Sequence, residues 1–212
     1  MRDDWFSAPT LSDAGLITPH PRLRLEPLTR DHAAGFLAAA GDHADQVFEH
    51  LSYDPPRTTG EAITIIDRLN APPDQLPYAQ IIAETGEFAG TTSLYEINPA
   101  ARALAVGSTW IAYTWWRTWL NSTSKLIMLS RAFDQLGAER VVWHTDICNV
   151  RSQTAIARLG AGHEGVLRHH KLRRDGSWRD TVIFSLLAPE WPAARDGLIS
   201  RVTAGLTDGV GT

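Results

Sequence analysis

Residues 109–125 read TWIAYTWWRTWLNSTSK, and this stretch decides the fold. Its β-branched and aromatic start predicts a strand, and the polar run after Leu120 predicts the beginning of a helix. The first amides of a helix lack intrahelical acceptors and lie at the positive end of the helix dipole. The junction therefore suits a phosphate or pyrophosphate, to which Lys125 can add a positive charge. The alternative is an ordinary capped helix with solvated Arg117 and Lys125, because a glycine-rich phosphate loop is absent.

The residues that follow predict a long helix with one buried face. Leu126, Leu129, Phe133 and Leu136 repeat at spacings of three, four and three, and Gly137 stands where a left-handed C-cap belongs. After this helix, residues 141–145 read VVWHT and predict a strand.

The rest of the chain predicts strands and helices on both sides of this unit. Asn149 can cap a second helix, and Thr58 and Glu61 form a capping-box pattern that opens an earlier one. The strands predicted are 22–27, 78–83, 88–97, 104–112, 141–145, 166–172 and 181–187, and a further helix is expected from residue 29 to residue 40. The three strands between residues 78 and 112 form an antiparallel meander, and Asp175-Gly176 marks a hairpin. These elements indicate an α/β (α+β) fold, a mixed and mostly antiparallel sheet with flanking helices.

Length and composition set the class of protein. The chain has 212 residues, of which 43% are hydrophobic and 21% charged, with a net charge of -4 and a pI near 6.0. These values predict one domain and make nucleic acid an unfavoured partner. The irregular Pro, Gly, Ser and Asp content of the start and the Gly and Thr content of the end predict an arm over 1–20 and a flexible tail over 199–212, so that the domain covers 21–198. The apolar runs are too short to span a membrane, and a lone Cys148 fits a reducing cytoplasm without a disulfide or a thiolate metal site. Nothing in the composition requires a homodimer, although it is compatible with one.

A set of linked motifs resembles the GNAT superfamily of acyl-CoA N-acyltransferases, most closely the branch of the ribosomal-protein N-terminal acetyltransferases. The resemblance covers about residues 22–191 and is most specific between Gly107 and Ser185. The motifs that carry it are Trp110-Ile111, Trp115-Trp116-Arg117-Thr118-Trp119-Leu120-Asn121, Lys125-Leu126, Gly137-Ala138-Glu139-Arg140-Val141, Asn149-Val150-Arg151-Ser152, Arg158-Leu159-Gly160-Ala161 and Arg179-Asp180-Thr181.

The resemblance implies a GNAT-like sheet with a splayed strand pair in which acetyl-CoA binds without a metal. It implies that backbone groups of Trp110 and Ile111 pair with pantetheine and that Asn149 contacts it. It also implies that the pyrophosphate is held at the helix start by Arg117, Thr118, Trp119, Leu120, Asn121 and Ser122, with Lys125 nearby. Trp119 stands where most of the family has a glycine.

The same resemblance suggests catalytic candidates. Ser152 matches the serine that the branch uses as an acid, whereas Ile156 stands at the position of the tyrosine acid of many members. Ala105 stands where the branch often has its base, so Glu96 and Asp146 are the alternatives. Without chemistry, Ser152 is a helix-start hydroxyl, and the two carboxylates are solvated strand ends.

The leading hypothesis is an enzyme that transfers acetyl from acetyl-CoA to a primary amine of a small molecule, peptide or protein N-terminus, by direct attack. The alternative is a CoA-binding sensor or interaction module with weakened catalysis. Two further hypotheses are weaker. Cys148, four residues from His144, could be a nucleophile, but a lone cysteine more often serves packing. His169 and His170 could bind a metal, but adjacent strand residues point to opposite faces. The sequence decides neither the acceptor nor the acyl chain.

Overall fold

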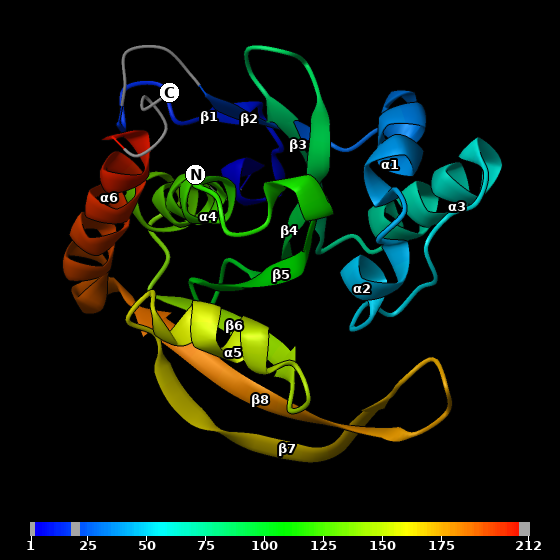
Figure 1. The fold of residues 1–212 in the computed structure, drawn as a ribbon. Coiled ribbons are helices and arrows are strands. Elements are labelled where there is room, and N and C mark those ends of the chain that lie inside the picture. The colour runs from blue at the N-terminus through cyan, green and yellow to red at the C-terminus, as the bar shows by residue number, and fades with distance from the viewer. Residues whose placement is uncertain (1–2, 18–21, 208–212) are drawn as a thin grey trace.

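The computed structural model describes residues 3–17 and 22–207. Its central element is an eight-stranded sheet with helices packed on both faces. Its strand order is β1-β2-β3-β4-β5-β6-β8-β7, and every neighbouring pair is antiparallel except β5 and β6 (Figure 1). The mixed, mostly antiparallel sheet and its flanking helices confirm the expected fold class.

The elements agree closely with the predicted ones, apart from short additions. The strands are β1 (Leu11–Ser12), β2 (Leu23–Pro27), β3 (Leu76–Ile82), β4 (Phe88–Asn98), β5 (Ala103–Ile111), β6 (Arg140–Asp146), β7 (Gly162–Leu172) and β8 (Trp178–Leu187). The helices are α1 (Ala33–Ala40), α2 (Ala44–Phe48), α3 (Thr59–Asn70), α4 (Leu120–Ser130), α5 (Val150–Ala157) and α6 (Trp191–Thr207). Short 3-10 helices are η1 (Asp3–Phe6), η2 (Arg30–His32), η3 (Tyr113–Trp115) and η5 (Ala188–Glu190), and η4 (Arg131–Gln135) is π-helical.

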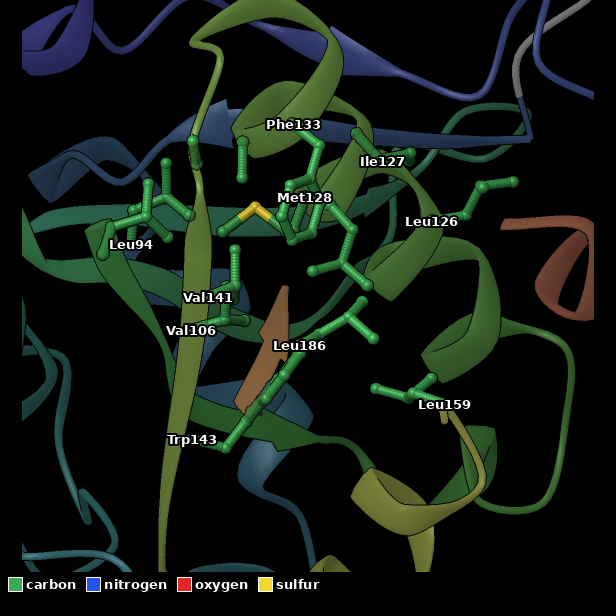
Figure 2. Close-up of a cluster of buried hydrophobic side chains, with 14 of the residues drawn as sticks. Leu94, Val106, Leu126, Ile127, Met128, Phe133, Val141, Trp143, Leu159 and Leu186 are labelled. Atoms are coloured by element: carbon green, nitrogen blue, oxygen red, sulfur yellow. The ribbon is translucent and has the colours of Figure 1, made fainter. Parts of the chain in front are cut away.

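The α4 helix forms as its leucine pattern predicts. Leu126 and Leu129 are fully buried, and Figure 2 shows α4 side chains meeting Val106 and Val141 from the sheet. The helix continues through η4, and Gly137 ends it with a φ of 67°, a left-handed value that favours glycine. This helix is therefore fixed by burial on the sheet and stopped by its C-cap.

Helices cover the two faces of the sheet in separate groups. On one face, α4, α5 and α6 enclose the larger core, and on the other α1, α2 and α3 enclose a second core around Phe36, Phe48 and Trp110 (Figure 1). Thr58 caps α3 by accepting a 3.1 Å hydrogen bond from the Glu61 amide, whereas the Glu61 carboxylate accepts from the Arg57 amide. The predicted cap is therefore present.

The parallel contact between β5 and β6 is short. Only three residue pairs join the two strands, Ala103 with Arg140, Leu104 with Val141 and Ala105 with Val142. From Val106 to Ile111, β5 continues along β4 without a partner on its β6 side. The expected splayed strand pair is therefore present, and a row of β5 backbone groups faces the opening.

Two β-bulges flank this opening. Between the pairs Thr91–Trp110 and Ser93–Gly107, β5 has one more residue than β4, and Ser108 there has a φ of 47°. Between the pairs Tyr95–Ala105 and Asn98–Ala103, the extra residue is on β4, where Glu96 has a φ of 51°. A bulge bends its strand and redirects side chains, so both irregularities bear on the site.

The two chain ends differ from the expected arm and tail within the described residues. At the N-terminal end, Trp5 is buried in the larger core and β1 pairs with β2. At the other end, α6 extends to Thr207, and Leu198 and Val202 are fully or almost fully buried, so the tail predicted from residue 199 is corrected to a packed helix up to 207. The Gly and Thr content of residues 199–212 favours a tail, whereas the buried Leu198 and Val202 have the four-residue spacing of a helix. Residues 208–212, like 1–2 and 18–21, lie outside the described part.

Within the described residues, every helix is too short or too polar to span a lipid bilayer.

We predict that Leu198→Ala lowers the free energy of unfolding by about 2–5 kcal/mol, because it leaves a cavity beneath α6. Urea denaturation followed by circular dichroism measures the change. Ser200→Ala, at an exposed position of the same helix, is the matched control and should change stability by about 0.5 kcal/mol or less. Equal stability of the two variants would contradict the packing of α6.

Candidate active site

The candidate site is the opening between β5 and β6, with α4 beginning at one end and α5 beside it. Arg117, which precedes α4, is exposed and has a φ of 61°. Thr118 donates to the Trp115 carbonyl at 2.8 Å and accepts from the Leu120 amide at 3.3 Å, which fixes the turn into the helix. The next amides, of Asn121 and Ser122, belong to the first helical turn and have no intrahelical acceptor. This end of the opening therefore presents donors that suit a pyrophosphate.

The tryptophans of this stretch have distinct structural roles. Trp110 packs against Phe36 and Phe48 at centroid distances of 4.8 and 4.9 Å, and its carbonyl accepts a 3.1 Å hydrogen bond from Gln80 on β3, so neither its indole nor its carbonyl faces the opening. Trp119 is half-buried beneath the Arg22 guanidinium, 4.0 Å from its ring centroid. Trp116 is covered in the same way by Arg151, at 3.8 Å. These cation–π contacts hold the loop before α4 in place.

Several predicted ligands can act through the backbone alone. The Leu120 side chain is fully buried in the core, and Ile111 is half-buried and accepts a 2.8 Å hydrogen bond from the Trp116 indole through its carbonyl. The side chains of Leu120 and Ile111 therefore serve core packing and do not face a ligand.

Lys125 differs from its predicted position beside the phosphates. Its side chain is 7% exposed, and its Nζ donates a 3.0 Å hydrogen bond to Thr109 Oγ1 on β5. The ammonium therefore lies inside the protein beneath the β5 bulge.

Asn149 and Ser152 lie together at the start of α5. The Asn149 side chain accepts a 2.9 Å hydrogen bond from the Ser152 amide and so caps the helix, as predicted. Ser152 is half-buried. Both roles suggested for its hydroxyl, acid or helix-start group, stay predictions.

Glu96, a predicted catalytic candidate, lies in a cluster with His144 and Tyr95, which the sequence does not predict as its partners. Its Oε1 is 3.5 Å from His144 Nδ1 on β6, and the same nitrogen is 3.2 Å from the Tyr95 hydroxyl. The Tyr95 ring packs on Gly107, where an added Cβ would come within 2.9 Å of Cε1. Two strands, β4 and β6, thus bring a carboxylate, an imidazole and a phenol together beside the opening. No local motif in the sequence marks His144 as a partner of Glu96, because the β4 bulge that brings them together leaves no sequence signal.

Burial shapes the acid–base properties of this cluster. Desolvation lowers the pKa of His144, although the Glu96 carboxylate opposes the effect. Desolvation likewise raises the pKa of Tyr95 well above its usual value. Neutral imidazole and neutral phenol are therefore the resting forms at pH 7. A neutral imidazole held by a carboxylate can accept a proton.

Asp146, the other candidate base, is held in a different set of interactions. Its carboxylate accepts two hydrogen bonds from Arg173, at 2.7 and 2.9 Å, and another from the Cys148 amide at 2.9 Å. Although its burial acts in the opposite direction, these partners lower the pKa of Asp146 to about 2. Such a carboxylate is a weak base and a good structural anchor.

The β7–β8 hairpin closes one side of this region. Its tip residue Arg174 donates to Asp54 at 2.7 Å and to the Phe48 carbonyl at 3.2 Å, so it reaches α2 and the loop behind it (Figure 1). Along the hairpin, His169 stacks on Trp178 at 5.2 Å, while His170 lies 6.3 Å from the His144 ring. The two adjacent histidines therefore contact different residues, His169 on Trp178 and His170 near His144.

Residues 22–162 match the family described as Acetyltransferase (GNAT) domain. The chain belongs to the GNAT acetyltransferase family. Among curated protein sequences, none matches this chain.

Solved structures agree with this membership of the GNAT family. A GCN5-related N-acetyltransferase from Brucella melitensis is 28% identical with a TM-score of 0.82, over 92% of this chain and 89% of that one. A candidate acetyltransferase from T. thermophilus is 32% identical with a TM-score of 0.80, over 92% and 98% of the two chains. Mycobacterium smegmatis RimJ in complex with CoA-disulfide is 23% identical with a TM-score of 0.70, over 93% and 96%, and this likeness shows the fold.

As a GNAT acetyltransferase, the protein depends on acetyl-CoA as its acetyl donor. The residues present fit that substrate, because the unpaired β5 edge offers backbone partners for pantetheine and the α4 start offers amides for the pyrophosphate. Among residues 3–17 and 22–207, no three His, Cys, Asp or Glu side chains are grouped as metal ligands.

We predict that Asp146→Asn destabilises this GNAT domain by about 2–3 kcal/mol at pH 7, because it removes the charge that Arg173 neutralises. The folded pKa lies below the ordinary value, so the contribution is present above pH 4 and is lost as the pH falls toward 2. The stability difference between wild type and variant should therefore shrink between pH 5 and pH 2 in urea titrations. The exposed Asp45→Asn is the control, and a pH-independent difference for Asp146→Asn would contradict this assignment.

Proposed function

We propose that this GNAT acetyltransferase transfers acetyl from acetyl-CoA to a primary amine of a small molecule, peptide or protein N-terminus, by direct attack in a ternary complex. The observation that carries the proposal is the contact of Glu96, His144 and Tyr95 beside the opening between β5 and β6.

The two faces of the sheet give the substrates separate approaches. Val106 and Trp143 point into the core beneath α4, so their neighbours Gly107 and His144 point to the opposite face. Glu96, His144 and Tyr95 therefore lie across the sheet from α4, whose start suits the CoA phosphates. An acetyl group carried along β5 would pass between the strands to meet an amine on the far side.

The reaction then follows from these positions. The nitrogen of the neutral amine forms a bond to the thioester carbon, and the carbonyl oxygen takes the negative charge in the tetrahedral intermediate. We assign the proton released by the amine to His144, whose Nδ1 is held by Glu96, with Glu96 as the direct alternative. The carbon–sulfur bond breaks next, and the CoA thiolate takes a proton.

Two further groups complete the proposed chemistry. Ser152, at the start of α5, is the proposed donor of the proton to the thiolate; its hydroxyl regains a proton from water, and His144 releases the amine proton to water. Amides of β5 near its bulge are the proposed donors to the oxyanion, because that edge has no strand partner. Positioning and the oxyanion donors can supply much of the rate enhancement, and one acid or base adds about 10²–10⁴-fold.

We predict that Glu96→Gln and His144→Gln each lower kcat/KM by about 10²–10⁴-fold, measured by thiol release from acetyl-CoA with a panel of primary amines. Because the pKa of His144 lies below its ordinary value of 6.5, wild-type kcat/KM should fall as the pH drops through that lower value. This acid limb should be absent in His144→Gln.

The control is Glu84→Gln, an exposed carboxylate on the β3–β4 turn, which should retain wild-type rates. Wild-type rates in both cluster variants would exclude the assigned base. Tight CoA binding by the wild type, without acetylation of any amine, would instead favour the sensor alternative, for which Trp119 in place of a glycine is the motivation.

A further inference from the structure

Lys125 is a buried cation whose charge is not neutralised by an ion pair. It is 7% exposed, and among the described residues no carboxylate lies within ion-pair distance of its Nζ. Its hydrogen bond goes to Thr109 Oγ1 at 3.0 Å. Burying an ammonium in this way is costly, and an apolar side chain of similar length would pack there without that cost. Because stability alone does not explain this buried charge, we expect a functional role for Lys125.

Thr109 connects the ammonium to the backbone of the β5 bulge. Its hydroxyl donates to the Gly107 carbonyl at 3.3 Å and lies 2.9 Å from the Thr92 hydroxyl on β4. Since the ammonium Nζ can only donate, Thr109 Oγ1 accepts from Lys125 and donates its own hydrogen bond to the Gly107 carbonyl. The network thus spans the irregular residues Gly107–Thr109, where β5 gains its extra residue.

This bulge borders the opening in which the proposed reaction takes place. The parallel pairing of β5 with β6 ends at Ala105, two residues before Gly107, and Gly107 carries the Tyr95 ring of the Glu96–His144 cluster. Lys125 lies on the α4 side of the strand and the cluster on the other side. A positive charge at this depth acts through few water molecules and therefore reaches further than at the surface.

We propose that Lys125 is a positioning residue for acetyl transfer. Through Thr109 it holds the β5 bulge so that the neighbouring amides meet the thioester oxygen, and its charge favours the negative charge that develops there. This inference rests on the proposed function.

The ammonium gives the reaction a distinctive pH dependence. Burial lowers the pKa of Lys125 to about 8. On the elements packed against α4, the charged groups have other surroundings: Arg22 lies on Trp119, Arg24 pairs with Glu26, Arg131 donates to the Asp4 carbonyl, Asp134 accepts from the Trp191 indole and lies 3.9 Å from Arg195, Arg201 donates to the Arg158 carbonyl, and Asp196 is exposed. Glu96 and His144 pair with each other across the sheet. Below pH 8 the side chain is therefore charged and the proposed effect present, and above pH 8 the effect is lost.

The test is Lys125→Met, which keeps the length and removes the charge. We expect kcat to fall by about 10- to 100-fold, while the dissociation constant of CoA, measured by calorimetry, changes less than about threefold. The ratio of wild-type to variant kcat should decline above pH 8, and taking the ratio cancels the titration of the acceptor amine. The variant should also melt at a higher temperature, because it no longer buries an ammonium.

Substitutions at Thr109 provide the matched controls. Thr109→Ser keeps the hydroxyl and should keep the wild-type rate, whereas Thr109→Val should resemble Lys125→Met. The double variant should be little slower than either single variant, because the two residues act through one connection.

Three outcomes would overturn the inference while leaving the proposed function intact: a kcat within twofold of wild type, a pH-independent ratio, or loss of CoA affinity as the main defect. The last would make Lys125 a ligand of CoA. A wild-type protein that binds acetyl-CoA and acetylates no amine would remove the proposed function and this inference with it.

Discussion

The parallel pairing of β5 with β6 lasts for three residue pairs, and the rest of the site depends on where it stops. Beyond Ala105 the two strands separate, because each follows a different neighbouring strand. β5 remains joined to β4 through a bulge at Ser108, and β6 remains joined to β8 along its whole length. The result is a strand edge without a partner strand inside the sheet. In most sheets the backbone groups of an internal strand edge would be paired, so this edge is the feature that a substrate can use.

Each layer around the opening contributes one part of the site. The α4 helix is anchored by its buried leucines, so its first turn stays fixed beside the end of β5. The β4 bulge turns Glu96 toward His144, and Arg174 at the hairpin tip joins that side of the sheet to α2. Packing far from the opening thus determines which donors and acceptors meet there. The polar groups on the two faces differ in kind, with free amides and a buried ammonium toward α4, and an imidazole–carboxylate pair on the other face.

The sequence predicted the elements better than the contacts between them. Local sequence patterns predicted α4, the caps at Thr58 and Asn149, and the Asp175-Gly176 turn, because each of these features depends on residues close together in the sequence. The pairing of His144 with Glu96 and the inward direction of Lys125 depend on bulges and on burial by distant strands, which leave no local signal. The end of α6 is a different case, because its buried residues Trp191, Ala194, Leu198 and Val202 have helical spacing, while the Gly and Thr content after residue 199 favoured a tail.

The most direct test of this account is a crystal structure of the protein with a non-hydrolysable acetyl-CoA analogue. The account predicts pantetheine along the β5 edge between Val106 and Ile111, the pyrophosphate at the amides of Asn121 and Ser122, and the acetyl carbonyl between the β5 bulge and His144. An analogue bound on another surface, or an acetyl group remote from His144 with β5 and β6 closed against each other, would contradict it.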